Sequence, residues 1–441
     1  MDIKKDSISR LLWYYTVPSL IGTLANGLYN IVDRIYIGQG VGAMAIAGLA
    51  ITFPIMNIIS AFGMLVGQGS AANLSLKLGK NDTESANKIL PNALYLIIFF
   101  NILTTVFGLI FLEPILRAFG GSEATIPYAK EYLKIIIPFN VFSTIGFSLA
   151  NIMRASGRPM VAMYTLVIGA ILNIAIDPIF IFWLDMGIQG AAIATVISMV
   201  ISSIWVLLWH FGDKKMTVRF QSTLLKPDFK IIAAIVAIGL SPFILQICTS
   251  LVNIIINHSL HKYGGDLAIG AFGIVSSFVM LIIMGVIGLS QGMQPIIGYN
   301  YGAKRYDRVK ETLKLCIIVA TIITSLGATV ALIFPSAIAR CFTNDIALID
   351  ITTNALRIHF SLFFIVGFHI ICTNYFQSIG KAGISILLST SRQILFLIPI
   401  VLILPNFWQL DGVWWSQTIA NFLATITAVG ILAHHLKYKL K

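Results

Sequence analysis

Asp177 is a carboxylate within an almost wholly apolar stretch of this 441-residue chain, in the run LNIAIDPIFIFW. It follows Asn173 by four residues and directly precedes Pro178. Residues four apart share a face of a helix, and a proline leaves the carbonyl four residues earlier without its helical donor. Carboxylate, amide and free carbonyl would then form a group of oxygen ligands, which suits a proton, Na⁺ or another hard cation.

A second acid, Asp33, stands in the run LANGLYNIVDRIYIG. Asn26 and Asn30 precede it by seven and three residues, a spacing that predicts one helical face. Inside a membrane a charged side chain costs at least about 2.5 kcal/mol, so such a polar stripe should face protein or a water-filled cavity. The alternative for both acids is a structural ion pair, with Arg34 or Arg392 as the partner.

The composition indicates the environment in which these acids must be held. Hydrophobic residues make up 57% of the chain and charged residues only 11%, whereas soluble domains have about 25% charged residues. The apolar runs are long and uninterrupted, which favours helices over the short alternating segments of a barrel. We therefore predict an all-α integral membrane protein.

A membrane-spanning helix needs about 20 apolar residues, and the sequence contains twelve segments of this kind. They are residues 11–37, 45–72, 89–112, 128–150, 160–183, 188–210, 229–256, 267–292, 313–335, 351–378, 384–404 and 412–436. The longest polar connection separates the sixth segment from the seventh. We therefore predict an N-terminal six-helix lobe (1–210), a cytoplasmic linker (211–228) and a C-terminal six-helix lobe (229–441).

The two halves repeat at a constant offset of 223 residues. The matching pairs are AIAGLAI at 45–51 with AIGAFGI at 268–274, GQGSAANLSLKLG at 67–79 with SQGMQPIIGYNYG at 290–302, and ASGRP at 155–159 with SIGKA at 378–382. Six spans are an even number, so both repeats should have the same orientation and be related by a pseudo-two-fold axis along the membrane normal. Two such bundles are typical of a transporter.

The net charge of +12 is distributed unevenly along the chain. Most lysines and arginines fall in the loops on one side of the predicted spans, which indicates a cytoplasmic side that holds both termini. We expect a multi-pass protein of the cell's inner (cytoplasmic) membrane. The basic residues then face anionic lipid, and we expect no nucleic-acid partner.

The second repeat lacks both acids. Counted from Pro18 and Pro242, Asn257 stands at the position that corresponds to Asp33, and Ile400 stands at the one that corresponds to Asp177. Acidic cation chemistry is therefore predicted for the N-terminal lobe alone. The sequence has no phosphate-binding Walker motif and no nucleophile with a histidine at a recognisable spacing, so we expect neither an enzyme nor a cofactor.

The chain resembles the multidrug and toxic compound extrusion (MATE) family, in particular its DinF-like or MepA-like branch. The similarity covers about residues 11–436. It is carried by the runs VDRIYIG, GQGSAANLSLKLGKND and RASGRPMVAMYTLVIGAILNIAIDPIFIF. The resemblance implies an antiporter that works by alternating access: H⁺ or Na⁺ enters while an organic, cationic or amphiphilic compound leaves.

The resemblance also implies roles for particular residues. The family's N-lobe cation site corresponds to Asp33, Asn173, Asp177 and Thr195, which would also hold Na⁺ in a sodium-coupled transporter. The family's hinge in the first span corresponds to Pro18, with Gly22 one turn later. One branch of the family has further acids in the C-lobe, but this chain has amides there. Candidates for the substrate cavity are Asn26, Asn30, Gln246, Asn253, Met280, Met284, Asn374 and Gln377.

Two other functions remain possible for such a sequence. A lipid-linked oligosaccharide flippase has a similar architecture, but its pyrophosphate substrate would require several arginines in the central cavity. Only Arg34 and Arg392 are candidates here. A membrane-embedded enzyme would require a paired nucleophile and base, or a metal cluster. We expect the transporter's partners to be a small-molecule substrate and the lipid bilayer, and we expect a monomer.

Overall fold

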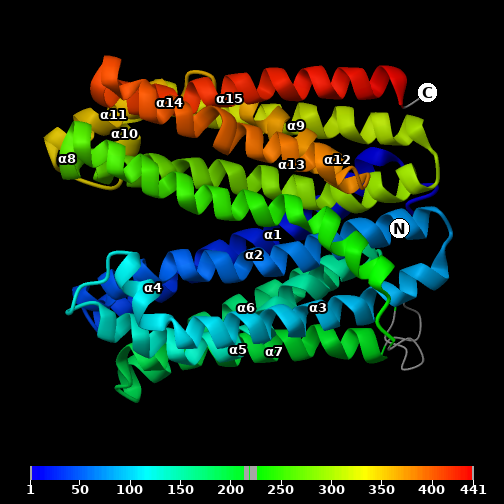
Figure 1. Ribbon diagram of the computed structural model, residues 1–441, viewed down its shortest axis with the longest axis horizontal. Coiled ribbons are helices and arrows are strands. Elements are labelled where there is room, and N and C mark those ends of the chain that lie inside the picture. The colour runs from blue at the N-terminus through cyan, green and yellow to red at the C-terminus, as the bar shows by residue number, and fades with distance from the viewer. Residues whose placement is uncertain (1, 213–217, 219–225, 440–441) are drawn as a thin grey trace. The chain divides into compact units, whose positions relative to one another are not determined.

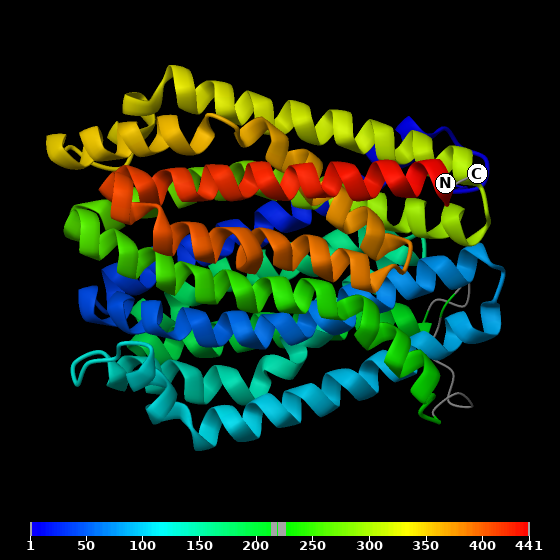
Figure 2. The same cartoon turned by 45° about the horizontal axis from the view of Figure 1, so that its top comes forward.

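The computed structural model describes residues 2–212, 218 and 226–439, and within these ranges the regular elements are all helices (Figure 1). The predicted all-α membrane fold is confirmed. The predicted linker, 211–228, lies mostly outside the described residues. The chain forms two units, which are described below. Within each unit the long helices run roughly parallel or antiparallel to one another (Figure 2).

The helices follow the predicted apolar segments closely. Their bounds are α1 Ile8–Gly40, α2 Ala43–Gly79, α3 Thr83–Ile110, α4 Leu112–Ala118, α5 Ile126–Ala155, α6 Pro159–Pro178, η1 Ile179–Trp183, α7 Gly187–Gly212, α8 Phe229–Gly302, α9 Tyr306–Ile333, α10 Pro335–Arg340, α11 Ile346–Phe360, η3 Phe363–Ile365, α12 Val366–Ser378, α13 Ala382–Thr390, η4 Ser391–Leu397, α14 Ile398–Ile403 and α15 Pro405–Tyr438.

The helices of the structure correspond to the twelve predicted spans. In the described part of the chain, nine helices are long and apolar enough to cross a membrane, and α11 with α12 forms a tenth span bent by 49°. The helix α8 has 74 residues and is broken at Gly265, where φ is 65°, so it supplies two spans. The 33-residue helix α1 covers the first predicted span.

The structure divides into two compact units. The first comprises Val17–Phe243, and the second comprises Asp2–Thr16 with Ile244–Lys441. The chain passes from one unit to the other at two points, and each point lies beside a proline inside a helix: Pro18 in α1 and Pro242 in α8. A proline lacks the N–H group for one backbone hydrogen bond of the helix. The start of α1 thus belongs to the second unit and the start of α8 to the first, an arrangement that loop lengths do not reveal.

In the first unit, α5 packs against α2, α3, α6 and α7. The start of α8 crosses α2 where two glycines meet, Gly69 and Gly239. A Cβ atom on Gly239 would lie 1.8 Å from the carbonyl oxygen of Leu65, so this crossing requires the absence of a side chain.

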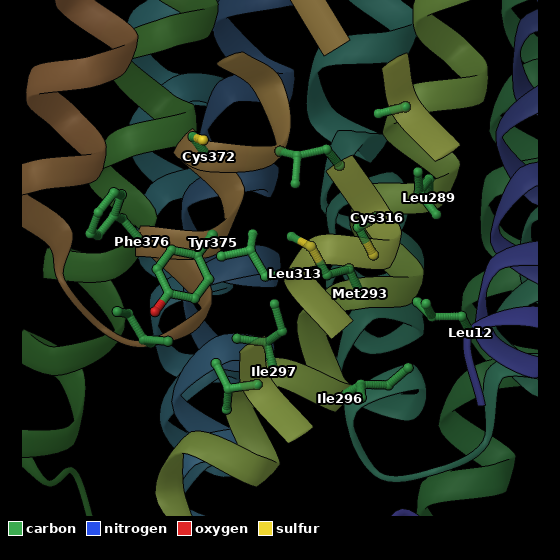
Figure 3. Close-up of a cluster of buried hydrophobic side chains, with 14 of the residues drawn as sticks. Leu12, Leu289, Met293, Ile296, Ile297, Leu313, Cys316, Cys372, Tyr375 and Phe376 are labelled. Carbon is green, nitrogen blue, oxygen red and sulfur yellow. The ribbon is translucent and has the colours of Figure 1, made fainter. Parts of the chain in front are cut away.

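In the second unit, α12 packs against α9, α13 and α15. Figure 3 shows the core where these helices meet α8 and the start of α1. Leu12 of α1 and Met293 of α8 lie in the same buried cluster as Cys316 of α9 and Tyr375 of α12. This cluster joins the first turns of α1 to the second unit.

The repeat is also visible in the backbone. Positions with positive φ recur at the same offset of 223 residues: Gly42 and Gly265, Asn81 and Lys304, and Gly157 and Gly380. These residues lie at helix breaks and turns. The two repeats therefore share turn geometry as well as helix order.

Candidate cation site

Asn173 and Asp177 lie on α6, just before that helix changes its winding. The α-helix ends at Pro178 and continues as the π-helical segment η1, in which the Leu184 amide donates to the Ile179 carbonyl at 2.9 Å. Such π-helical turns occur frequently at functional sites, because they widen the helix and redirect its side chains.

Asn173 connects the carboxylate to the next helix. Its Nδ2 donates to Oδ1 of Asp177 at 3.2 Å and to Oγ1 of Thr195 on α7 at 3.1 Å. The exposed fractions of these side chains are 1% for Asn173, 0% for Asp177 and 6% for Thr195. The amide thus holds the acid of α6 and the hydroxyl of α7 together inside the unit.

Asp33 of α1 completes the cluster. It is 8% exposed, and its carboxyl group lies close enough to that of Asp177 for the two to interact. Small residues allow this approach: a Cβ on Gly22 would lie 2.9 Å from Leu166 of α6. The structure therefore brings together all four residues of the expected cation site.

Three buried oxygens in this cluster have no hydrogen-bond partner. They are Oδ1 of Asp33, Oδ1 of Asn173 and Oδ2 of Asp177. A buried polar atom without a partner costs about 1–3 kcal/mol. A proton or a hard cation would satisfy these oxygens. Carboxylate, amide and hydroxyl oxygens are ligands that suit hard cations. Within the described residues there is no group of three or more His, Cys, Asp or Glu side chains that could hold a metal ion.

The structure does not support a structural ion pair for either acid. Among the salt bridges of the described residues, none involves Asp33, Asp177, Arg34 or Arg392. Arg34 lies within electrostatic range of Asp33, but no salt bridge of the described residues joins the two.

Two tyrosines near the acids were not predicted. Tyr29 of α1 and Tyr132 of α5 lie within electrostatic range of both carboxyl groups, and Tyr132 also lies beside Thr195. Tyr29 precedes Asp33 by four residues, so its helical spacing could have revealed it. Tyr132 comes from a different helix, and no sequence pattern connects it to the acids.

The predicted polar face of α1 is divided in the structure. Asp33 is buried, whereas Asn26 and Asn30 are exposed on the unit's surface, and Asn30 Nδ2 donates to the Asn26 carbonyl at 2.7 Å. With 3.6 residues per turn, Asn30 and Asp33 are rotated apart by roughly 60°, which is enough to place them on opposite sides of the boundary between interior and surface. Pro18 is buried within α1, as is Gly22.

The remaining substrate candidates lie in the second unit. Gln246, Asn253, Met284 and Asn374 are half-buried, Met280 is exposed and Gln377 is buried. The Asn374 amide donates to the Ile370 carbonyl of its own helix at 2.9 Å. The structure thus gives these residues positions, on α8 and α12, without assigning them a ligand.

Comparison with known proteins identifies the family. A family model described as MatE matches the chain twice, over residues 18–179 and 242–403. The chain belongs to the MatE family of transporters. The two matches begin at Pro18 and Pro242, and each covers the corresponding part of one repeat, so the repeat of this MATE transporter is a property of the family model as well.

Relatives and solved structures extend the similarity over nearly the whole chain. The multidrug export protein MepA of Staphylococcus haemolyticus is 27% identical over 429 residues, which cover 97% of this chain and 94% of MepA. The MATE multidrug transporter DinF-BH, solved in complex with a ligand, is 38% identical with a TM-score of 0.90, covering 96% of this chain and 95% of DinF-BH. An outward-facing multidrug resistance MATE transporter of the MOP superfamily is 25% identical with a TM-score of 0.93, covering 99% and 97%. This chain is therefore a membrane transporter and not an enzyme.

Proposed function

We propose that this MATE transporter exports organic, cationic or amphiphilic compounds in exchange for H⁺ or Na⁺. The coupling ion binds Asp33, Asn173, Asp177 and Thr195. The observation that carries this proposal is the set of three unpartnered buried oxygens beside two carboxyl groups. The relatives include a multidrug export protein and a MATE multidrug transporter, which supports organic compounds as substrates.

One coupling ion is sufficient for useful export. A charge that moves inward across 100 mV supplies about 2.3 kcal/mol, whereas tenfold accumulation of a neutral solute requires about 1.4 kcal/mol. A substrate that carries net positive charge outward requires more, which a chemical gradient of the ion can supply.

The ion changes the conformation through α1. It neutralises carboxyl groups from α1 and α6, so its arrival and departure change the attraction between these helices. Pro18 and Gly22, near the point where α1 passes from one unit to the other, form the hinge that lets α1 respond. Alternating access then exposes the substrate-cavity residues to each side in turn. The transporter acts as a monomer in the inner membrane with both termini in the cytoplasm.

Efflux of a fluorescent amphiphilic dye from proteoliposomes tests this function. Imposed pH and Na⁺ gradients are applied separately to wild type, Asp177→Asn and a control, Asp185→Asn, whose acid lies at an exposed turn after η1. We expect at least one gradient to drive efflux of the dye by wild type and by the control, and no coupled efflux by Asp177→Asn.

The driving gradient identifies the coupling ion. If folded Asp177→Asn exports the dye as fast as wild type under the same gradient, then Asp177 is structural and the proposed coupling site is wrong.

A further inference from the structure

The exposed face of α1 forms an open groove with α2. Its lining residues are Ile31, Arg34, Ile35, Gly38 and Gln39 of α1 and Ile46 of α2, and its volume is about 550 Å³. The five residues of α1 follow the three- and four-residue spacing of a single helical face. The volume falls within the range of about 300–1,000 Å³ that is typical of small-molecule sites.

This face of α1 is amphipathic along its length. One edge is polar, with Asn26, Asn30 and Arg34 exposed at intervals of four residues. The adjacent edge is apolar and equally exposed: the exposed fractions are 56% for Ile31 and 49% for Ile35. A compound with a hydrophobic body and a polar edge would match both halves of the surface.

Arg34 is the one charged residue among the described residues that line the groove. Its guanidinium lies 5.6 Å from the centre of the Phe53 ring of α2, and it belongs to none of the ion pairs of the described chain. The aromatic contact orients the guanidinium without neutralising its charge. Its planar donors match a carboxylate or phosphate in two-point geometry.

The nearest acid is turned the other way. Asp33 is adjacent to Arg34 in sequence and within electrostatic range of it, but the Asp33 side chain is rotated by about 100° around α1, is buried and interacts with Asp177. Neighbouring residues of a helix do not face each other. A positively charged compound in the groove would therefore meet a positive charge, whereas an anionic group would meet an arginine that forms no salt bridge within the described residues.

We propose that this groove binds the exported compound and that Arg34 recognises an anionic group on it, so that the preferred substrates are zwitterionic or anionic amphiphiles. This inference rests on the proposed export function and specifies its substrate class. The occupant is the transported compound itself. The phosphate of a membrane lipid offers the same chemistry and is distinguished by the experiment.

The experiment compares two xanthene dyes that are identical except that one has a free carboxylate and the other its methyl ester. Gradient-driven efflux is measured in vesicles of zwitterionic phospholipid for wild type, Arg34→Gln and Arg34→Lys. The matched control is Lys134→Gln, which removes an exposed positive charge from α5 outside the groove.

We expect wild type to have a higher kcat/KM for the carboxylate dye than for the ester dye. In Arg34→Gln the ratio of these two values should fall about tenfold, which is the effect of losing one charged hydrogen bond. Arg34→Lys should retain part of the preference because it keeps the charge, and Lys134→Gln should retain all of it. Residual efflux of the ester shows that a variant is folded.

Two results would overturn the inference. The first is the same preference for the carboxylate dye over the ester dye in wild type and in Arg34→Gln. If wild type still exports the ester in that case, the proposed function stands and only the role of Arg34 is wrong. The second is that the carboxylate dye binds to wild type but is not exported, and that added anionic phospholipid displaces it. This result would mean that Arg34 binds a lipid headgroup. Failure of wild type to export either dye under any gradient would instead contradict the proposed function.

Discussion

Equivalent positions in the two repeats differ in charge and polarity. In the first unit, Asp33, Asn173, Asp177 and Thr195 form a buried polar cluster. In the second unit, the offset of 223 residues leads from Asn173, Asp177 and Thr195 to Phe396, Ile400 and Thr418, and counting from the prolines Pro18 and Pro242 leads from Asp33 to Asn257. Asn257 is exposed, Phe396 and Ile400 pack against a hydrophobic core, and the Thr418 hydroxyl donates to the Ile358 carbonyl of α11 at 3.0 Å.

The difference shows that the scaffold does not need the polar cluster. The second unit forms its helices and turns with apolar side chains at two of the four positions, and apolar packing avoids the cost of buried charge. A carboxyl pair is therefore retained in the first unit for what it binds. The asymmetry supports the proposal that the coupling ion binds in one half of the repeated molecule.

Replacing the acid and its counterpart should give the largest contrast. Asp33→Ala removes one of the two carboxyl groups, so we expect ion-coupled efflux to fall at least about 100-fold. Asn257→Ala changes an exposed residue and should leave efflux within about twofold of wild type. The measurement is the initial rate of dye efflux in proteoliposomes, and similar losses in both variants would remove the asymmetry.

The two threonines provide a matched pair. Thr195→Val removes the hydroxyl that accepts from Asn173, so we expect about tenfold weaker binding of the coupling ion. Thr418→Val removes only a hydrogen bond to backbone and should lower the free energy of unfolding by about 1 kcal/mol without changing ion affinity. Ion titration and thermal unfolding of both variants separate the two effects. Weaker ion binding by Thr418→Val would contradict the comparison.

Helix crossings differ between the units in a similar way. In the first unit Gly239 lies against the backbone of α2, whereas its equivalent in the second unit, Thr16, has a side chain and contacts Gly292. Gly239→Ala should lower the free energy of unfolding by about 1–3 kcal/mol, because the added methyl group would overlap the Leu65 carbonyl.

A control for that crossing is Gly273→Ala, since a Cβ there would meet no atom within 4 Å. Thermal unfolding in detergent compares the two variants. An equal melting temperature for Gly239→Ala and Gly273→Ala would show that the α2–α8 crossing tolerates a side chain.

The smallest effect on the unfolding free energy is expected at the equivalent loops that precede α3 and α9. Asp82 caps α3 by accepting from the Ser85 amide at 3.1 Å, whereas Arg305 at the start of α9 has no side-chain cap. Hydrogen bonds from Lys77 and Ser85 lower the pKa of Asp82 from 3.8 to about 2. This stabilisation is complete above about pH 4 and is lost as the pH falls toward 2.

Asp82→Ala should therefore cost about 1 kcal/mol, with no variation between pH 5 and pH 8. Arg305→Ala removes no cap, only an exposed hydrogen bond to the Lys4 carbonyl, and should lower the unfolding free energy by less. Unfolding curves at several pH values check both. A cost for Asp82→Ala that changes between pH 5 and pH 8 would mean that another group titrates with Asp82.

Much of this structure could be predicted from patterns along single helices. The apolar lengths predicted the spans, and the constant offset predicted the repeat that the family match covers twice. The four-residue spacing of Asn173 and Asp177 placed two ligands on one face of α6. Such features depend only on residues that are neighbours on one helix.

Features that depend on packing between helices could not be predicted in this way. Tyr132 reaches the site from α5, and nothing near it in sequence indicates the acids. The burial of Asp33 and the exposure of Asn30 depend on how α1 is rotated against α6, which side-chain volumes such as that of Leu166 against Gly22 determine. The exchange of helix ends at Pro18 and Pro242 is likewise a matter of packing.

The most direct test of the central claim is the binding of H⁺ and Na⁺ to the purified transporter, measured by calorimetry for wild type, Asp177→Asn and Thr418→Val. We predict that wild type and Thr418→Val bind the same ion with the same affinity and that Asp177→Asn does not bind it. Unchanged ion binding by folded Asp177→Asn, or its loss in Thr418→Val, would contradict a coupling site confined to the first repeat.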